Sequence, residues 1–221
     1  MNSPRLPGKV LKPLAGRPML EIFLRRLSNA RLDAVIVATT DSAGDDPIVA
    51  LATKLGYAVT RGSELDVLDR FTQCARSHSV DRIVRVTSDC PAIDAALVND
   101  LLLVDADLVV NNTPRTYPHG MDAEVFTRSA LESAWRDARE PHHREHVTPF
   151  LREHPDRFRL VNRPCPDGRY GDLRVTVDWP EDLELLQRLF DELGTEFGWR
   201  DVVAGFERHP EWAEVNRSRA T

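Results

Sequence analysis

Cysteine is scarce in this chain, and its three cysteines stand far apart. Cys74, Cys90 and Cys165 form none of the closely spaced pairs that are typical of a structural zinc site. Their odd number also argues against a disulfide framework. The fold must therefore rest on a hydrophobic core, and a chain of 221 residues is long enough to bury one.

Long apolar runs, repeats and low-complexity segments are absent as well. No run approaches the roughly 20 apolar residues of a membrane helix, so we expect a cytoplasmic protein without membrane insertion. The formal net charge of −6 disfavours a nucleic acid held by bulk electrostatics. The first 31 residues nevertheless hold seven Lys or Arg and one acidic residue. Such a basic end can attract a small polyanion, although a basic helix facing solvent would give the same count.

Apolar, β-branched segments alternate with helical patterns along the chain. The expected strands are Ala34–Thr40, Ala58–Arg61, Arg82–Thr87, Leu108–Asn111, Ala123–Phe126, Phe158–Val161 and Leu173–Val177. The expected helices are Pro18–Arg31, Asp46–Leu55, Asp66–His78, Asp94–Val104, Thr127–Arg139 and Pro180–Leu193. This alternation predicts an α/β fold with a mostly parallel central sheet, and a less regular, mixed lobe near 106–162. We expect one domain over residues 1–210 and a polar tail over 211–221 that frays.

The opening stretch "SPRLPGK" has the residue types of a phosphate-binding loop. Lys9 offers a point charge and Arg5 a planar fork, both suited to phosphate oxygens. Gly8 lets the backbone approach a ligand closely. The stretch is not a Walker loop, and a plain Pro-Gly turn explains it equally well.

Two acidic residues each follow an expected strand. Asp89 follows "IVRVTS" and Asp178 follows "LRVTV". Ligands of open α/β sheets bind beyond the carboxyl ends of strands, and Mg²⁺ takes carboxylates together with phosphate oxygens. The alternative is that each acid caps the next helix, but Asp94 already suits that role in the first case.

The stretch "HHREH" places three histidines at helical spacing, which could suggest zinc. His142, His143 and His146 have no Glu in a His-Glu-x-x-His frame, and Arg144 would repel a metal ion. We therefore expect no metal there.

Eight stretches, in this order, resemble one known family. They are "PRLPGKVLKPLAGRPML", "VIVATT", "DDPIVALATKLG", "RGSELDVLDR", "VRVTSDCPAID", "NNTPRTYPHGMDAEVF", "REHVTPF" and "VTVDWPEDLELL". Together they resemble the cytidylyltransferases that include the spore-coat polysaccharide biosynthesis protein F group. Related families activate acylneuraminate and 3-deoxy-manno-octulosonate.

The resemblance implies a nucleotide-diphosphosugar transferase fold (Rossmann-like, three layers), CTP as substrate and Mg²⁺ as cofactor. It implies that Arg5 and Lys9 hold the triphosphate and that Asp89 and Asp178 hold the metal. The remaining implied site residues lie near the base or ribose (Gly62, Ser63 and Arg70) or near the acceptor (Asp122, Glu124 and His146).

The resemblance also implies that the first strand of the central sheet is missing. Family members usually begin with a short hydrophobic strand, and Met1 matches a Met inside that region. We therefore expect the upstream reading frame to encode a further apolar, β-branched run that ends in a basic residue.

The expected function is transfer of CMP from CTP to a sugar acid or related acceptor for surface polysaccharide or glycoconjugate biosynthesis, with release of pyrophosphate. A glycosyltransferase of similar fold that uses a nucleotide sugar is the first alternative. A catalytically inactive homologue that acts in binding or assembly is the second, because of the missing strand. A homodimer is among the expected assemblies.

Overall fold

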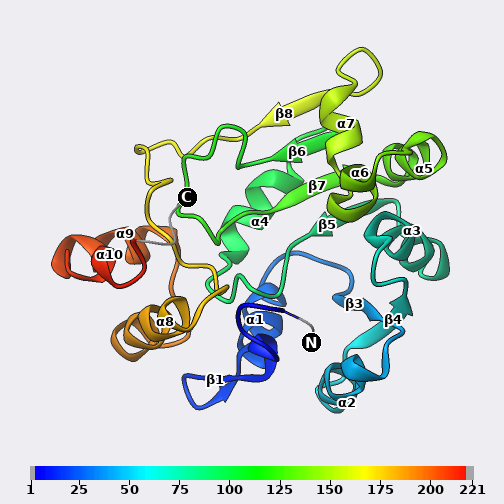
Figure 1. Ribbon diagram of the computed structural model, residues 1–221. Helices are drawn as coiled ribbons and strands as arrows, with labels where there is room; N and C mark the ends of the chain where they lie inside the picture. Colours follow the sequence, from blue (N-terminus) through cyan, green and yellow to red (C-terminus); the bar gives the residue numbers. More distant parts are fainter. Residues whose placement is uncertain (1–2, 218–221) are drawn as a thin grey trace.

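The computed structural model describes residues 3–217, in which short strands alternate with helices (Figure 1). The strands are β1 (Pro13–Leu14), β2 (Arg17–Pro18), β3 (Ile36–Thr40), β4 (Ala58–Gly62), β5 (Arg82–Arg85), β6 (Leu108–Val110), β7 (Glu124–Thr127) and β8 (Leu160–Asn162). The 3₁₀-helices are η1 (Lys9–Leu11) and η2 (Ala43–Asp45). The α-helices are α1 (Met19–Leu27), α2 (Asp46–Lys54), α3 (Val67–Ser77), α4 (Ala95–Leu102), α5 (Arg128–Asp137), α6 (Pro141–His146), α7 (Pro149–Glu153), α8 (Pro180–Leu193), α9 (Trp199–Arg208) and α10 (Trp212–Val215).

The main strands form two separate pieces, which corrects the expectation of one mostly parallel sheet. β3 and β4 pair in parallel, while the second piece has the order β5-β7-β6-β8. In that piece β7 runs antiparallel to both β5 and β6, and only β6 and β8 are parallel. A cavity of about 1020 Å³ is lined by 31–39 on the β3 side and 78–88 on the β5 side. Within residues 3–217, neither β3 nor β5 pairs with a strand across this cavity.

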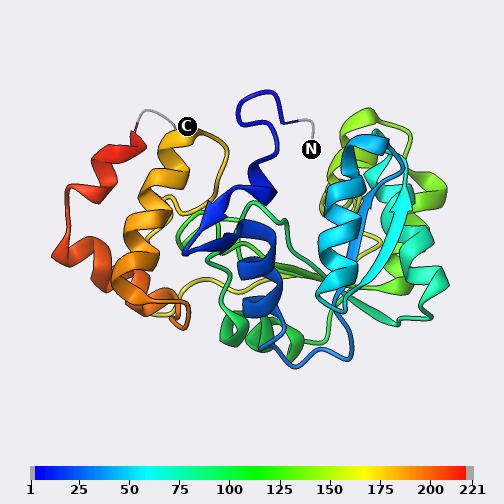
Figure 2. The ribbon, with the colours of Figure 1, turned by 90° about the horizontal axis from the view of Figure 1, so that it is seen from below.

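Helices cover both faces of the β6–β7 pair, which gives the three expected layers. Val109 and Val125 face each other in the register and belong to the larger core, with α1, α4, α8 and α9. The neighbouring pair Leu108 and Phe126 belongs to a second core, with α3, α5 and α7. Successive side chains of a strand point to opposite faces, so a strand buried on both faces must be apolar at every position. Figure 2 shows the α8–α9 side and the α2–α3 side at opposite ends of the molecule.

All six expected helices are present within a few residues of their predicted bounds, and six of the seven expected strands are confirmed. The strand expected at Leu173–Val177 is wrong. That segment makes a single bridge, between Arg174 and His119. The bridge cannot extend, because the chain turns at Gly120, where φ is +109°. The hairpin β1–β2 and the helices α6, α7, α9 and α10 were not expected, because such short elements carry little periodicity.

The basic N-terminal segment is largely occupied by structural contacts. Arg17 and Arg25 both pair with Glu21 of α1. Arg26 is buried; it donates to the carbonyl of Phe197 at 2.8 Å and lies over that residue's ring. The charge count of this segment therefore overstates its free positive field. No helix within residues 3–217 is long and apolar enough to cross a membrane.

The described part of the expected polar tail packs against the domain. Trp212 is 4% exposed and Asn216 is 3% exposed. The Trp212 ring stacks on His209, with the ring centroids 4.6 Å apart. Fraying therefore does not extend to residues 212–216, and residues 218–221 lie outside the described range.

Candidate active site

The Lys9 ammonium joins two carboxylates that are distant in the sequence. Gly8, with φ +66°, turns the opening loop into η1, of which Lys9 is the first residue. Lys9 Nζ lies 3.0 Å from Asp89 Oδ2 and 3.0 Å from Asp178 Oδ1, and it donates to the Val177 carbonyl at 2.7 Å. The opening loop, the segment after β5 and the segment before α8 thus meet at one point.

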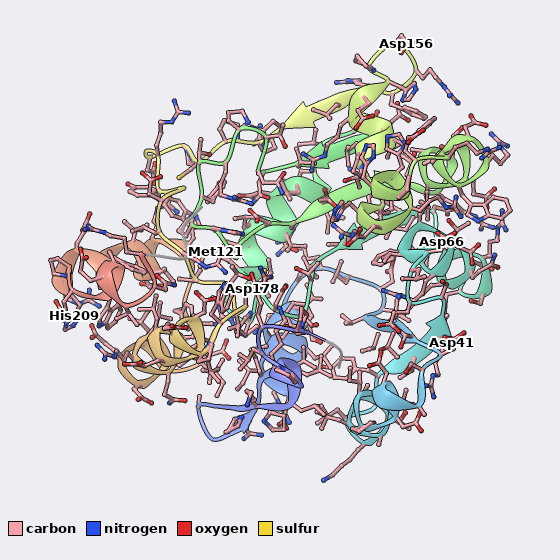
Figure 3. The ribbon with its side chains drawn as sticks, in the orientation of Figure 1. Asp41, Asp66, Met121, Asp156, Asp178 and His209 are labelled. Carbon is pink, nitrogen blue, oxygen red and sulfur yellow. The ribbon has the colours of Figure 1, made fainter. Side chains whose placement is uncertain are left out.

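The Asp178 carboxylate contacts three cationic side chains. Besides Lys9, its carboxylate accepts from Arg5 at 2.8 Å and from Arg174 at 2.9 Å. Arg5 also lies over the Trp179 ring, 5.4 Å from its centroid. Asp178 lies near the centre of the molecule in Figure 3. One carboxylate therefore orients three cationic side chains.

Asp182 anchors the segment that carries Asp178. Its fully buried carboxylate accepts from Arg174 and from the backbone N–H groups of Asp178 and Trp179, at 2.8–3.1 Å. Asn216 donates to it at 2.9 Å from the C-terminal end of the described chain. Asp182, rather than Asp178, therefore satisfies the free N–H groups at the start of α8.

The sequence prediction missed Arg174, Asp182 and Asn216. One signal was present, because an acid in the first turn of a helix suits its N-terminal dipole. Nothing in the sequence, however, linked Asp182 to Arg174 or to Asn216.

The charged groups of the cluster shift one another's pKa values, and their charges sum to zero. Burial disfavours the charged form of Lys9, but Asp89 and Asp178 outweigh it and raise the pKa of Lys9 above its ordinary value. Burial opposes ionisation of Asp178, yet the hydrogen bonds and charges of Lys9, Arg174 and Arg5 lower its pKa to about 2. Three cations (Arg5, Lys9 and Arg174) face three carboxylates (Asp89, Asp178 and Asp182).

The carboxylates of Asp89 and Asp178 fit a magnesium ion. Oxygens of Asp89 and Asp178 already converge on one cation, the Lys9 ammonium. Carboxylate oxygens are the ligands that Mg²⁺ takes in nucleotide sites, together with phosphate oxygens and waters. Since the cluster is neutral by itself, Mg²⁺ would need a polyanion that draws Lys9 and Arg5 away from the carboxylates.

The residues expected near the base or ribose lie together at the end of β4. Arg70 of α3 donates to the Ser63 carbonyl at 2.6 Å. A Cβ on Gly62 would lie 3.1 Å from Arg70 Cγ, so a side chain there would press on the arginine. Arg70 lines the large cavity, whose wall also includes Val10 and Ser88, the chain neighbours of Lys9 and Asp89. The cavity thus connects the Arg70 region with the Lys9 cluster.

Asp122 lies beside the Lys9 cluster. It pairs with Arg115 at 2.8 Å. The neighbouring His119 accepts at Nδ1 from Arg174 at 3.2 Å if its ring is in the matching tautomer. Burial and the charges of Arg115 and Arg174 lower the pKa of His119, despite the opposing charges of Asp122 and Asp178.

Glu124 is buried, so it has little surface to offer a ligand. Its carboxylate pairs with Arg85 at 2.7 Å and with Arg152 at 2.6 Å, and it accepts from Thr148 at 2.7 Å. Burial opposes its ionisation, but the two arginines lower the pKa of Glu124 below its ordinary value. Of the three acceptor-side residues, His146 is exposed at the end of α6 and lines the large cavity together with Arg85.

The fold matches a solved cytidylyltransferase from Leptospira borgpetersenii serovar Hardjo-bovis. The TM-score is 0.91 at 32% identity, over 96% of this chain and 92% of that chain. This likeness defines an α/β nucleotidyltransferase of the nucleotide-diphosphosugar transferase type.

The cytidylyltransferase family model matches residues 1–202, and the chain belongs to that family. It is 39% identical to the uncharacterized protein MJ1063 of Methanocaldococcus jannaschii, over 97% of this chain and 90% of the relative. It is 32% identical to the spore coat polysaccharide biosynthesis protein SpsF of Bacillus subtilis, over 96% of this chain and 93% of SpsF. The protein is thus a CTP-dependent nucleotidyltransferase.

Proposed function

We propose that this protein transfers CMP from CTP to a sugar acid or related acceptor, with Mg²⁺ as cofactor and pyrophosphate as the second product. The proposal extends to surface polysaccharide or glycoconjugate biosynthesis, to a cytoplasmic location and to a homodimeric assembly. The observation that carries the reaction is the cluster in which Lys9 joins Asp89 and Asp178. It supplies cations for a triphosphate and oxygens for a metal ion at one point.

The side chains of the cluster would have three roles, which are phosphate binding, metal binding and positioning. Lys9 and Arg5 would move from the carboxylates to the phosphate oxygens and stabilise the charge that develops on the leaving pyrophosphate. Asp89 and Asp178 would hold Mg²⁺, which when bound supplies a Lewis acid at the reacting phosphate. Arg174 and Asp182 fix the Asp178 carboxylate, so part of the rate comes from positioning.

The preference for an anionic acceptor rests on Glu124 and its partners. Arg85 and Arg152 leave this buried group with one net positive charge. Arg85 also lines the large cavity. Glu124 would therefore position the two arginines, and Arg85 would bind the carboxylate of an acceptor in the cavity. The attacking group is then a hydroxyl of the sugar acid, which must lose its proton as it bonds to the α-phosphorus while pyrophosphate leaves.

The test is pyrophosphate release from each of the four nucleoside triphosphates, with Mg²⁺ and a panel of sugar acids and neutral sugars. CTP with a sugar acid should give the highest rate. Preference for UTP, or turnover of a nucleotide sugar without free CTP, would overturn the proposal.

A matched pair of variants tests the role of Lys9. Lys9→Met should lower kcat/KM by about 10² or more, since it removes a charge that stabilises the transition state. Lys12→Met, three residues further along the loop, has no ion pair in the described chain and should stay within about twofold of wild type. Equal losses in both variants would show that only the general charge of the loop matters.

A further inference from the structure

A cluster of two histidines and one glutamate lies outside the candidate active site. His142 Nε2 lies 3.0 Å from Glu153 Oε1, and His143 Nε2 lies 2.7 Å from Glu153 Oε2. The three ligand atoms all lie within 4.8 Å of one another. The histidines belong to α6 and Glu153 ends α7, two short helices that lie next to each other in Figure 1.

The geometry points to a binding site for a transition-metal cation of the zinc class, and we propose that such an ion clips α6 to α7. Two imidazole nitrogens and one carboxylate, with a water in the fourth position, form a ligand set that zinc uses. A tetrahedral ion with bonds of about 2.0–2.1 Å needs its donors roughly 3.4 Å apart. The nitrogen–oxygen distances of 2.7 and 3.0 Å meet this requirement after a small outward movement.

The convergence of the two rings distinguishes this cluster from an ordinary imidazole–carboxylate pair. Both histidines present the same ring nitrogen to one carboxylate, and their ring centroids are 4.0 Å apart. His143 is buried, and its ring meets Phe150 edge-to-face, which holds it in place. His142 and Glu153 are each about half exposed, so an ion can enter from solvent.

The arginine that argued against a metal in the sequence points elsewhere. Arg144 donates through Nε to Asp66 at 2.9 Å and through Nη1 to the Trp135 carbonyl at 2.8 Å. Its charge is therefore paired away from the histidines. The third ligand comes from α7 as Glu153, which lies outside the HHREH stretch.

The metal ion would stabilise a segment whose residues also bind Glu124, one of the residues expected near the acceptor. Thr148, between the two helices, and Arg152 of α7 both bind Glu124. Asp66, which binds Arg144, caps the N-terminus of α3, the helix that carries Arg70. An ion that fixes α6 to α7 would therefore stiffen one wall of the large cavity without touching the Lys9 cluster.

The experiment measures metal binding directly, so that its result does not depend on turnover. Chelator-treated full-length protein is titrated with Zn²⁺ by calorimetry, and with Co²⁺ by its visible absorption. We expect one Zn²⁺ per chain, tetrahedral-type Co²⁺ bands and a higher melting temperature. His142→Gln and Glu153→Gln, both at exposed positions, should each weaken Zn²⁺ binding more than about tenfold.

His209→Gln is the matched control. His209 is a partly exposed histidine that also pairs with glutamates, 2.6 Å from Glu192 through Nε2 and 3.3 Å from Glu211 through Nδ1. Its partners use opposite ring nitrogens, so they cannot chelate one ion, and His209 lies on the far side of the molecule in Figure 3. Absence of saturable Zn²⁺ binding, or equal weakening in His209→Gln, would overturn the proposal.

Discussion

Lys9 separates two carboxylates that would otherwise repel each other. Its ammonium lies 3.0 Å from an oxygen of Asp89 and 3.0 Å from an oxygen of Asp178. Under the proposed function, the triphosphate of CTP would compete for Lys9 and free the two acids for a metal ion. At the scale of single residues, Lys9 therefore holds the two proposed metal ligands in an ion-pair network.

The Asn variants of these two acids separate a metal-binding role from a structural one. Asp89→Asn and Asp178→Asn each keep the shape but remove a negative ligand, so each should lower turnover by about 10² or more. The double variant should be little worse than either single one, because groups that act as a unit are not additive. Pyrophosphate release measures both effects.

Asp167→Asn provides the control for these variants. Asp167 forms an ion pair of 2.6 Å with Arg200, but both side chains are well exposed. Its loss should change turnover and stability little. Near-normal turnover in Asp89→Asn or Asp178→Asn would contradict the metal assignment.

The depressed pKa of Asp178 predicts how the stability of the fold changes in acid. The pKa is about 2 in the folded protein against an ordinary 3.8, so ionised Asp178 stabilises the fold above about pH 4. This contribution, on the order of 2 kcal/mol, should be lost as the pH falls from about 4 to about 2. The gap in unfolding free energy between wild type and Asp178→Asn should thus narrow over that window in denaturant titrations. A gap of constant size would show that the ion pairs of Asp178 do not stabilise the fold.

At the scale of elements, β3 has one paired edge and one edge without a partner strand within residues 3–217. Asp41 N–H donates to the Gly62 carbonyl at 2.9 Å, so Val37 and Thr39, at alternate positions of this parallel pair, also face β4. Ile36 and Ala38 face the opposite edge, which borders the large cavity. Open strand edges are positions where another strand can pair.

Amide hydrogen exchange tests this description of β3. The amides of Ile36 and Ala38 should exchange faster than those of Val37 and Thr39, because only the second pair donates to β4. Residue-resolved exchange by NMR measures the difference within one strand, so each strand residue serves as the control for its neighbour. Equal protection of all four amides would show that a further strand occupies the cavity in solution.

At the scale of the whole molecule, substrate and metal should stabilise the fold together. The Lys9 cluster is neutral alone, so Mg²⁺ without nucleotide should bind weakly. At a hundredfold excess over Kd, bound CTP with Mg²⁺ should add about 2.7 kcal/mol, or roughly 5–10 °C in melting temperature. Thermal denaturation with CTP, Mg²⁺, both or neither measures this coupling. A large shift with Mg²⁺ alone would contradict the neutral-cluster argument.

The sequence by itself determined the α/β class, the main helices and most strands. Hydrophobic periodicity depends only on neighbouring residues, so it can be read from the sequence. In the same way, Pro180 and the two acids after it mark the start of α8 locally. Asp89 and Asp178 could be paired in advance because each follows an apolar, β-branched run of the sequence, and ligands of α/β sheets bind beyond the carboxyl ends of strands. The run before Asp178 forms only an isolated bridge in the structure, yet the two acids still meet. Lys9 and Arg5 were recognisable from the chemistry of their loop.

Only the tertiary structure decided which groups meet across the chain. Arg174, Asp182 and Asn216 form one buried network, although Asn216 comes from a tail that its polarity predicted to be frayed. Glu124 became a buried partner of arginines, and Glu153 of α7 became the carboxylate partner of His142 and His143. Burial and pairing of polar groups depend on distant segments, and no local pattern encodes them.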